Sequence, residues 1–330
     1  MVRYIIRRLL GAIVLLAVIS AITFAVFFAL PTSPGDLACG KSCTPERIAS
    51  INAALGLNRP VAVQYADYMK NLVTGDSVPQ GSGQFTDCPR PCLGVSFKQY
   101  QPVRTLLAAA FPATVSIALG SAVLFLIVGV GIGVIAALRR GGPVDKGLMS
   151  ASLFFYSVPL YVLGLALQLL LVYKFQIFPV VRYNPLSNGI GPWIQGLILP
   201  WIALTLLYAA GYSRFMRSSM LETLQEDFIR TARAKGLPKS TVTLRQGLRG
   251  AVTPIVTLFG LDLAGLLGGA VITESVFNIQ GIGKLAIQSI NDTDLPLIMG
   301  TVLLAAFFIV LANVVVDVFY AVIDPRVRLT

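Results

Sequence analysis

Three charged side chains stand inside apolar stretches of the sequence, where a charge is costly and is therefore a candidate for function. They are Asp262, Asp317 and Lys174. Intramembrane hydrolysis would need such groups as paired aspartates or a serine–lysine couple, with a convergent nucleophile and base. Asp317 and Lys174 lie near the ends of their stretches, where a charge faces water or pairs with a neighbouring helix. Asp262 lies deeper, and two interpretations stay open for it: lining a pathway, or structural pairing.

Most other catalytic chemistry lacks its side chains. The chain contains no histidine, which excludes a histidine-dependent catalytic triad and a histidine metal site. A G-x-x-x-x-G-K-[ST] phosphate loop is absent, because Gly283-Lys284 lacks the upstream glycine and the following hydroxyl. We therefore expect a chain that is not catalytic and that binds no metal or cofactor of its own.

The cysteines form two closely spaced pairs, Cys39-x3-Cys43 and Cys88-x3-Cys92. Four cysteines allow three pairings, so two local loops and a cross-brace between the pairs are both open. Zinc is the alternative, but the spacing is not the usual C-x2-C and there is no histidine to complete the ligands. We expect disulfides, because the charge pattern places this segment outside the cytoplasm, where disulfides persist.

Composition identifies an integral membrane protein. Hydrophobic residues make up 55% of the 330 residues and charged residues 12%, whereas globular domains carry about 25% charged residues. The net charge of +11 is concentrated in short loops beside apolar segments, as the positive-inside bias requires. We therefore expect contact with membrane lipid and no nucleic-acid partner.

Six apolar segments are long enough to cross a bilayer. The first, Leu9–Leu30, exceeds the roughly 7–15-residue core of a cleaved signal peptide, so we expect it to be retained. Basic residues precede it and gather in the loops 139–147 and 214–249 and in the tail, which predicts cytoplasmic N- and C-termini. The other five segments are Ala113–Leu138, Leu148–Phe175 (interrupted by Pro159), Ile194–Tyr212, Pro254–Val276 and Pro296–Ile323.

These segments divide the chain into four parts. Residues 1–30 form an N-terminal stub and the first span, and residues 31–104 a mostly helical extracytoplasmic lobe. Residues 105–323 form the transmembrane core, and residues 324–330 a cytoplasmic tail. In the lobe, the spacing of apolar residues predicts amphipathic helices at Ile48–Leu55 and Val61–Leu72.

Glycines in two spans predict close helix packing. Gly129-x-Gly131-x-Gly133 lies in the second span, where small residues let another helix approach. The fifth span is also rich in small residues, which favour close packing or leave room beside a passage. The candidate pathway residues there are Asp262, Gly265, Gly269 and Glu274.

The longest polar stretch of the core is Glu222–Pro254, between spans four and five. Its first half predicts a short helix that is acidic at its start and basic at its end, which suits the helix dipole. Glu226 and Arg230 have the spacing of a favourable ion pair, and Gly236 is expected to end the helix. Met220, Leu224 and Phe228 would give it an apolar stripe. A basic amphipathic helix lying on anionic lipid is the alternative, which the acidic first turn disfavours.

The segment EDFIRTARAKGLPKS, followed by Thr253-Pro254, resembles the "EAA" loop of ABC-importer permeases. Further stretches resemble, in the same order, the B-type permease subunit of the dipeptide, oligopeptide and nickel group. They are RYIIRRLLGAIVLL, Pro34-Gly35-Asp36, LGLNRPVAVQYADYM, FPATVSIALG, ITESVFNIQGIGKL and DPRVR. The resemblance covers nearly the whole chain. It implies a type I ABC-importer permease fold, all-α with six transmembrane helices, in the bacterial plasma (inner) membrane.

The resemblance also implies a set of partners. A homologous C-type permease subunit would complete the passage, and two cytoplasmic ATPase subunits or domains would bind ATP and Mg. An extracytoplasmic substrate-binding protein would deliver the peptide. The loop 214–253 would contain a coupling helix that docks on the ATPase. Its contact residues would be Glu226, Asp227, Phe228, Arg230, Thr231, Ala232, Arg233, Ala234, Lys235 and Gly236.

The chain departs from the family pattern outside the membrane. A Gly-Asp-Leu-Gly run that is usually continuous is split here, because Ser77–Cys92 separates Gly75-Asp76 from Leu93-Gly94. We expect the cysteines to brace this enlarged lobe. The implied function is import of short peptides, with nickel chelates or glutathione as alternative substrates. A secondary transporter and an intramembrane hydrolase are the alternatives from other classes.

Overall fold

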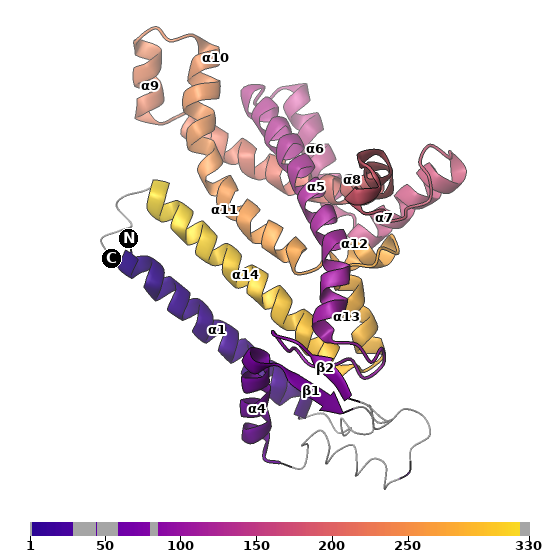
Figure 1. The fold of residues 1–330 in the computed structure, drawn as a ribbon. Helices are drawn as coiled ribbons and strands as arrows, with labels where there is room; N and C mark the ends of the chain where they lie inside the picture. Colours follow the sequence, from indigo (N-terminus) through magenta and orange to yellow (C-terminus); the bar gives the residue numbers. More distant parts are fainter. Residues whose placement is uncertain (1, 29–43, 45–58, 80–84, 324–330) are drawn as a thin grey trace. The chain divides into compact units, whose positions relative to one another are not determined.

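The computed structural model describes residues 2–28, 44, 59–79 and 85–323, and most of these residues are helical (Figure 1). Contacts between residues divide the chain into two compact units. The first unit contains Met1–Thr114, Leu267–Val271 and Gln280–Thr330, and the second contains Val115–Leu266 and Ile272–Ile279.

Five helices in the described part of the chain are long and apolar enough to cross a membrane. They are α1 (Val2–Phe28), α5 (Val103–Leu138), α8 (Ile190–Thr223), α11 (Leu248–Leu267) and α14 (Leu295–Ile323). Predicted spans one, two, four and six are confirmed, although α5 begins before Ala113 and α8 continues past Tyr212. The chain is therefore a multi-pass membrane protein.

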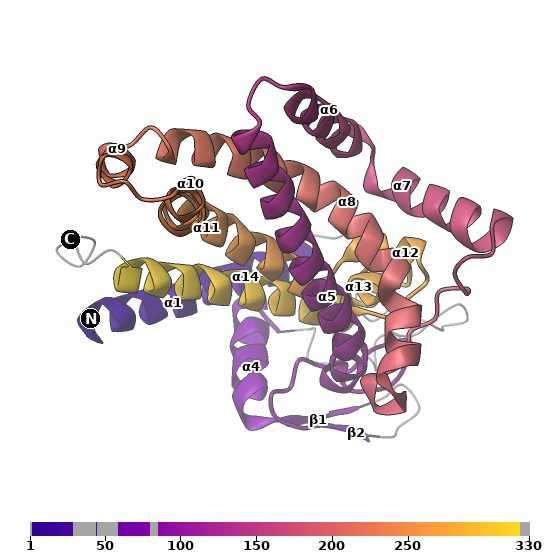
Figure 2. The same cartoon turned by 90° about the horizontal axis from the view of Figure 1, so that it is seen from above.

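The third predicted span is broken at Pro159, where the sequence predicts an interruption. It consists of α6 (Pro143–Ser157) and of α7 (Leu160–Leu167) with the π-helical turns η1 (Gln168–Lys174), bent by 99° at the break (Figure 2). Val158 has an extended backbone, with φ −81° and ψ 123°. Pro159 explains this conformation, because a proline disfavours the helical region for the residue before it. The pair provides a sixth span when it is counted as one.

The fifth predicted span, Pro254–Val276, was too long. Helix α11 ends at Leu267, and a separate short helix, α12 (Val271–Val276), follows. Between them Gly269 has a φ of +133°, and a Cβ on it would lie 2.9 Å from Cα of Gly283. Only glycine fits this combination of backbone conformation and close approach. The break therefore follows from Gly269, one of the glycines of the predicted fifth span.

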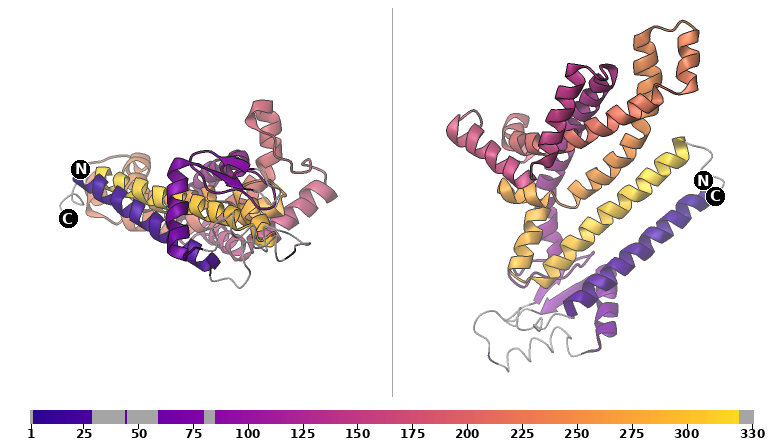
Figure 3. Two further views of the ribbon diagram at one scale, coloured as in Figure 1. Left: turned by 60° about the horizontal axis from the view of Figure 1, so that its bottom comes forward. Right: turned by 180° about the vertical axis from the view of Figure 1, so that it is seen from behind.

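In the first unit, α1 lies along α14 (Figures 1 and 3). The start of α5 packs against α13 (Ile282–Asn291) and α14 through a buried cluster that includes Val103, Ile282 and Leu297. The buried carboxylate of Asp294 accepts hydrogen bonds from the Ser96 hydroxyl and from the backbone N–H groups of residues 97 and 98. These bonds hold the end of the lobe to the beginning of α14.

The described part of the lobe contains one helix and an antiparallel hairpin. Helix α4 (Val61–Thr74) confirms the predicted helix at Val61–Leu72. Strands β1 (Asp76–Pro79) and β2 (Phe85–Cys88) form the hairpin, whereas we had expected a mostly helical lobe. Both strands come from or adjoin the insertion Ser77–Cys92, which therefore folds back onto itself.

One of the two cysteine pairs is a local disulfide loop. Cys88 is bonded to Cys92, with 5.2 Å between their Cα atoms, and both side chains are buried beside Val95. Within the loop, Arg90 donates from Nε to the carbonyl oxygen of Thr74 at 2.9 Å, which joins the loop to the end of α4. Cys39 and Cys43, like the predicted helix Ile48–Leu55, lie outside the described residues.

In the second unit, α5 and α8 are in close contact. A Cβ on Gly129 would lie 2.6 Å from Cβ of Tyr212, and a Cβ on Gly133 would lie 2.6 Å from Cβ of Met216. Gly131 has open space around it. The prediction of close packing is confirmed for the two outer glycines of this motif, which let α8 approach α5.

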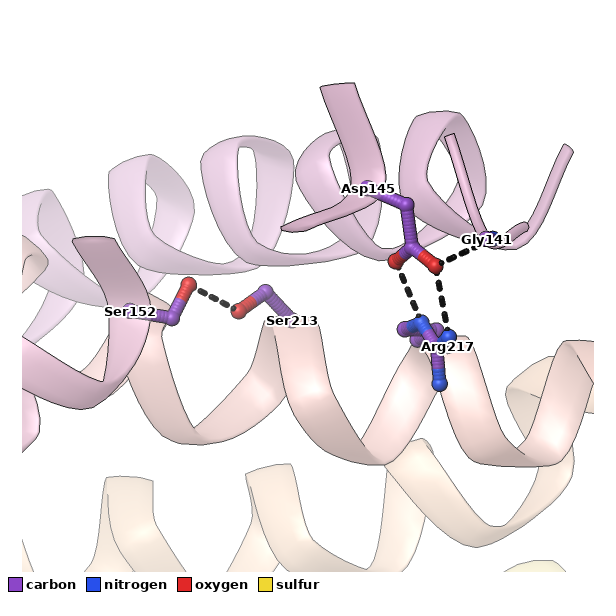
Figure 4. A network of polar contacts seen from close by, with 5 residues as sticks. All are labelled: Gly141, Asp145, Ser152, Ser213 and Arg217. Atoms are coloured by element: carbon purple, nitrogen blue, oxygen red, sulfur yellow. Dashed lines mark hydrogen bonds and ion pairs between the residues drawn. The ribbon is translucent and has the colours of Figure 1, made fainter. Parts of the chain in front are cut away.

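Helix α6 is held to α8 by polar side chains (Figure 4). Arg217 donates to Asp145 through two nitrogens, from Nε to Oδ1 at 2.6 Å and from Nη2 to Oδ2 at 2.7 Å. The backbone N–H of Gly141 donates to the same carboxylate at 2.8 Å, and Asp145 is only 3% exposed. The hydroxyls of Ser152 and Ser213 lie 2.8 Å apart. We call these contacts the α6–α8 clamp.

We expect Arg217→Ala to destabilise the protein, because it leaves the Asp145 carboxylate, which is shielded from water, without its counter-charge. The loss is measured as a lower midpoint of thermal unfolding of the detergent-solubilised protein. Arg245→Ala is the matched control, since it removes an exposed arginine with the same change in net charge. The double variant Asp145→Ala/Arg217→Ala should recover part of the loss. Equal unfolding midpoints for Arg217→Ala and its control Arg245→Ala would contradict a stabilising role of the Asp145–Arg217 pair.

Candidate functional site

The loop between α8 and α11 forms a small helical hairpin. It contains α9 (Asp227–Ala234), α10 (Lys239–Thr241) and the π-helical turns η3 (Val242–Gly247), which continue into α11. Figure 1 shows α9 and α10 side by side beyond the ends of α8 and α11. The predicted short helix is therefore present, between two candidate spans.

The hairpin has a small core of its own. Ile229 and Ala232 of α9 are buried against Val242, and Leu224 packs against this cluster. At the end of α9, Gly236 has a φ of +77°. The backbone N–H of Leu237 donates to the carbonyl of Ala232, and that of Gly236 to the carbonyl of Arg233. This pair of bonds is the Schellman motif, so the prediction that Gly236 ends the helix is confirmed.

Two details of the predicted helix were wrong. Helix α9 begins at Asp227 with Glu226 as its N-cap residue, and Arg230 pairs with Asp227 at 3.4 Å rather than with Glu226. The proposed apolar stripe of Met220, Leu224 and Phe228 does not lie on one helix, because α8 ends at Thr223. The buried face of α9 consists of Ile229 and Ala232 instead.

The outer surface of α9 remains exposed. Phe228, a large apolar side chain in this polar segment, is 48% exposed. Of the predicted contact residues, only Ala232 is buried. The exposed ones are Glu226, Asp227, Phe228, Arg230, Thr231, Arg233, Ala234, Lys235 and Gly236. An aromatic side chain surrounded by charges of both signs is suited to bind a protein surface, where aromatic and arginine side chains carry most of the binding energy.

Asp262 makes a hydrogen bond with a neutral partner. It lies in α11 and is half-buried, and the Tyr212 hydroxyl donates to its Oδ2 at 2.8 Å. Phe125 lies 5.0 Å from both Tyr208 and Tyr212, measured between ring centroids, so this contact belongs to an aromatic cluster. Within the described residues, no cation lies at ion-pair distance from Asp262. The structure thus shows one partner in the chain, and the pathway interpretation stays a prediction.

The four candidate pathway residues do not share one helix. Gly265 lies on α11 with Asp262 and is exposed, with open space where a Cβ would be. Gly269 lies in the break after α11, and Glu274 lies in α12 and is fully buried. Among the described residues, no three histidine, cysteine, aspartate or glutamate side chains gather in a way that could hold a metal ion.

The other two charges from the apolar stretches are placed differently. Lys174 is the last residue of η1, is exposed, and lies 5.7 Å from the centroid of the Phe175 ring. This position at the end of a span agrees with the expected water-facing role. The side chain of Asp317 lies outside the described part of the structure.

Comparison with known proteins accounts for the whole chain. Residues 129–329 match the family described as binding-protein-dependent transport system inner membrane component. Residues 1–118 match the N-terminal model of the same membrane components.

Two relatives are similar over nearly their full length. A probable peptide ABC transporter permease protein of Sinorhizobium fredii is 36% identical, over 98% of this chain and 99% of its own length. The glutathione transport system permease protein GsiC of Escherichia coli K12 is 35% identical, over 99% of both chains.

A solved structure has the same fold. It is a chain of the MetNI methionine ABC transporter, with a TM-score of 0.53 and 17% identity. The match covers 67% of this chain and 97% of that one. With a family model that matches more than half of its residues and relatives above 30% identity, this chain belongs to the binding-protein-dependent transport system inner membrane components.

Proposed function

We propose that this chain is one permease subunit of an ATP-driven importer that takes up short peptides delivered by an extracytoplasmic binding protein. Family membership supports transport that depends on a binding protein. The names of the relatives support the substrate class, because one is a probable peptide permease and another a glutathione permease. Glutathione is itself a small peptide, so both names point to the same chemistry. The observation that carries the coupling part of the proposal is the exposed surface of α9.

In this proposal the chain forms half of a passage and hydrolyses nothing. ATP and Mg are bound in two cytoplasmic ATPase subunits or domains, and a homologous C-type permease subunit completes the passage. The sequence supports this division, because the chain has no phosphate loop and no histidine. We place the chain in the plasma membrane. The basic loops support a topology in which both termini and α9 lie on the cytoplasmic side.

Helix α9 has the build of a lever. Its inner face is fixed by the Ile229 cluster, and its end is fixed by the Schellman motif at Gly236. A movement imposed on its outer face is therefore passed to α8 and α11 instead of being absorbed by the hairpin. The α6–α8 clamp extends this stiffness to a third helix.

The direct test uses the complex purified with its partner subunits and binding protein. We expect its ATPase rate to rise with loaded binding protein, for short peptides of increasing length and for glutathione. Glutathione as the only stimulating substrate would narrow the substrate class. Peptide uptake that survives removal of the ATPase subunits would refute the proposal.

Three variants test the docking of α9. Gly236→Pro removes the left-handed conformation of the cap, Glu226→Arg reverses a charge at the acidic end, and Phe228→Ala removes the exposed ring. We expect each to lower uptake by at least about tenfold while the protein still inserts into the membrane. Leu244→Ala is the matched control, because Leu244 is exposed on η3 of the same hairpin. Normal uptake in the first three variants would exclude docking through α9.

We also propose that the translocation pathway is lined by Asp262 and Gly265 of α11, by Gly269 of the break that follows α11, and by Glu274 of α12. Asp262→Asn keeps a partner for the Tyr212 hydroxyl but removes the charge. We expect uptake to fall by about fivefold, or about 1 kcal/mol, with no change in thermal stability. Tyr212→Phe is the comparison, because it removes the hydrogen bond and keeps the carboxylate. Loss of stability in Asp262→Asn with normal uptake per folded molecule would assign Asp262 to structural pairing.

A further inference from the structure

A pocket of about 420 Å³ opens between α6 and α8, close to the α6–α8 clamp. Tyr156 comes from α6, and the other lining residues come from one stretch of α8. They are Gly211, Arg214, Phe215 and Ser218. All five residues belong to the second unit. Neither the passage nor the docking of α9 uses this pocket.

The pocket contains a guanidinium group with donors to spare. Cζ of Arg214 lies 5.9 Å from the centroid of the Tyr156 ring, in a cation–π contact. Within the described residues, no carboxylate lies at ion-pair distance from Arg214, whereas the adjacent Arg217 is neutralised by Asp145. A cation–π contact leaves the N–H groups of an arginine free to bind an anion.

The other walls are suited to an amphipathic ligand. Tyr156 and Phe215 are 56% and 52% exposed, so the pocket has large aromatic surfaces beside its charge. The Ser218 hydroxyl donates to Glu222 at 3.2 Å, and Glu222 does not line the pocket. Arg214 is therefore the group that would hold an anion.

The position of the pocket along α8 indicates which layer of the membrane surrounds it. The apolar part of α8 ends at Tyr212, and Arg214 and Arg217 follow within about two turns. Arg139 and Arg140 directly follow α5 and precede α6. Basic residues and aromatic rings at the end of an apolar segment lie at the level of lipid headgroups. An opening at this level meets lipid phosphates at high local concentration.

We propose that this pocket binds the phosphate of an anionic phospholipid, with Arg214 as the main donor and Tyr156 and Phe215 against the acyl and glycerol part. Inorganic phosphate shares the headgroup chemistry but would leave the two aromatic rings exposed. The bound lipid joins α6 to α8 one turn from the clamp, on the helix that leads to α9. The proposal does not depend on which substrate is transported.

The test uses the complete transporter complex in detergent, with phosphatidylglycerol and phosphatidylcholine added in equal amounts. Native mass spectrometry measures how much of each lipid is retained. We expect wild type to retain phosphatidylglycerol in preference, and Arg214→Ala to reduce this retention by roughly fivefold, as for the loss of one basic contact to an anionic lipid. Lys174→Ala is the matched control, because Lys174 also lies over a ring, that of Phe175, but outside the pocket.

A second variant tests the space in the pocket independently of the charge of Arg214. A Cβ on Gly211 would meet the Tyr156 ring at 3.6 Å, an ordinary contact, so Gly211→Leu extends into the pocket without a backbone clash and keeps Arg214. We expect it to lose phosphatidylglycerol retention as Arg214→Ala does. Retention equal to wild type in both variants would overturn the proposal. A separate measurement compares how much inorganic phosphate and phosphatidylglycerol each raise the midpoint of thermal unfolding of the complex. Equal increases would overturn the assignment to a lipid.

Discussion

The constraint that governs this structure is that a polar group in an apolar surrounding must find its partner inside the protein. Asp145 meets it with a bidentate arginine and a backbone N–H. The hydroxyls of Ser152 and Ser213 satisfy this constraint by a hydrogen bond to each other. The carboxylate of Asp294 satisfies it by accepting hydrogen bonds from a hydroxyl and two backbone N–H groups. Each solution joins two segments that are distant in the sequence, so the cost of burying polar groups also fixes which helices are neighbours.

The same constraint explains why the charged outer face of α9, for which we propose docking, lies outside the spans. Helix α9 buries only Ile229 and Ala232, which is enough to hold it to η3 but covers little of its circumference. Its charged outer face needs no partner in this chain, because water solvates it. A surface of this kind costs the isolated subunit little and is available to another protein. The buried side of α9 supplies rigidity, and the exposed side is the surface on which we propose that another protein docks.

The sequence predicted features whose causes are local. Span lengths follow from apolar runs, and the end of α9 follows from Gly236 and the residues beside it. The interruption at Pro159 was predicted from the proline itself, but the break at Gly269 was missed, because an apolar run has the same composition whether it is straight or broken. The hairpin of the lobe and the Asp145–Arg217 pair depend on contacts between distant segments, which spacing along one chain does not reveal. For the broken spans, the available signal in the sequence was a proline, or several glycines close together, inside a long apolar run.

Asp145 and Asp262 of the second unit show how the partner decides the role of an acidic side chain that is shielded from water. Asp145 is paired with a guanidinium, so the pair is neutral as a whole and can act only as a fastening between α6 and α8. Asp262 receives its hydrogen bond from a neutral phenol, and within the described residues no cation lies close enough to cancel the charge of its ionised carboxylate. An uncompensated charge on a half-buried helix face repels anions and attracts cations. The ammonium terminus of a peptide is such a cation, whereas a purely structural acid gains nothing from staying uncompensated. This difference in partners is the physical ground for proposing Asp262, and not Asp145, as a residue of the passage.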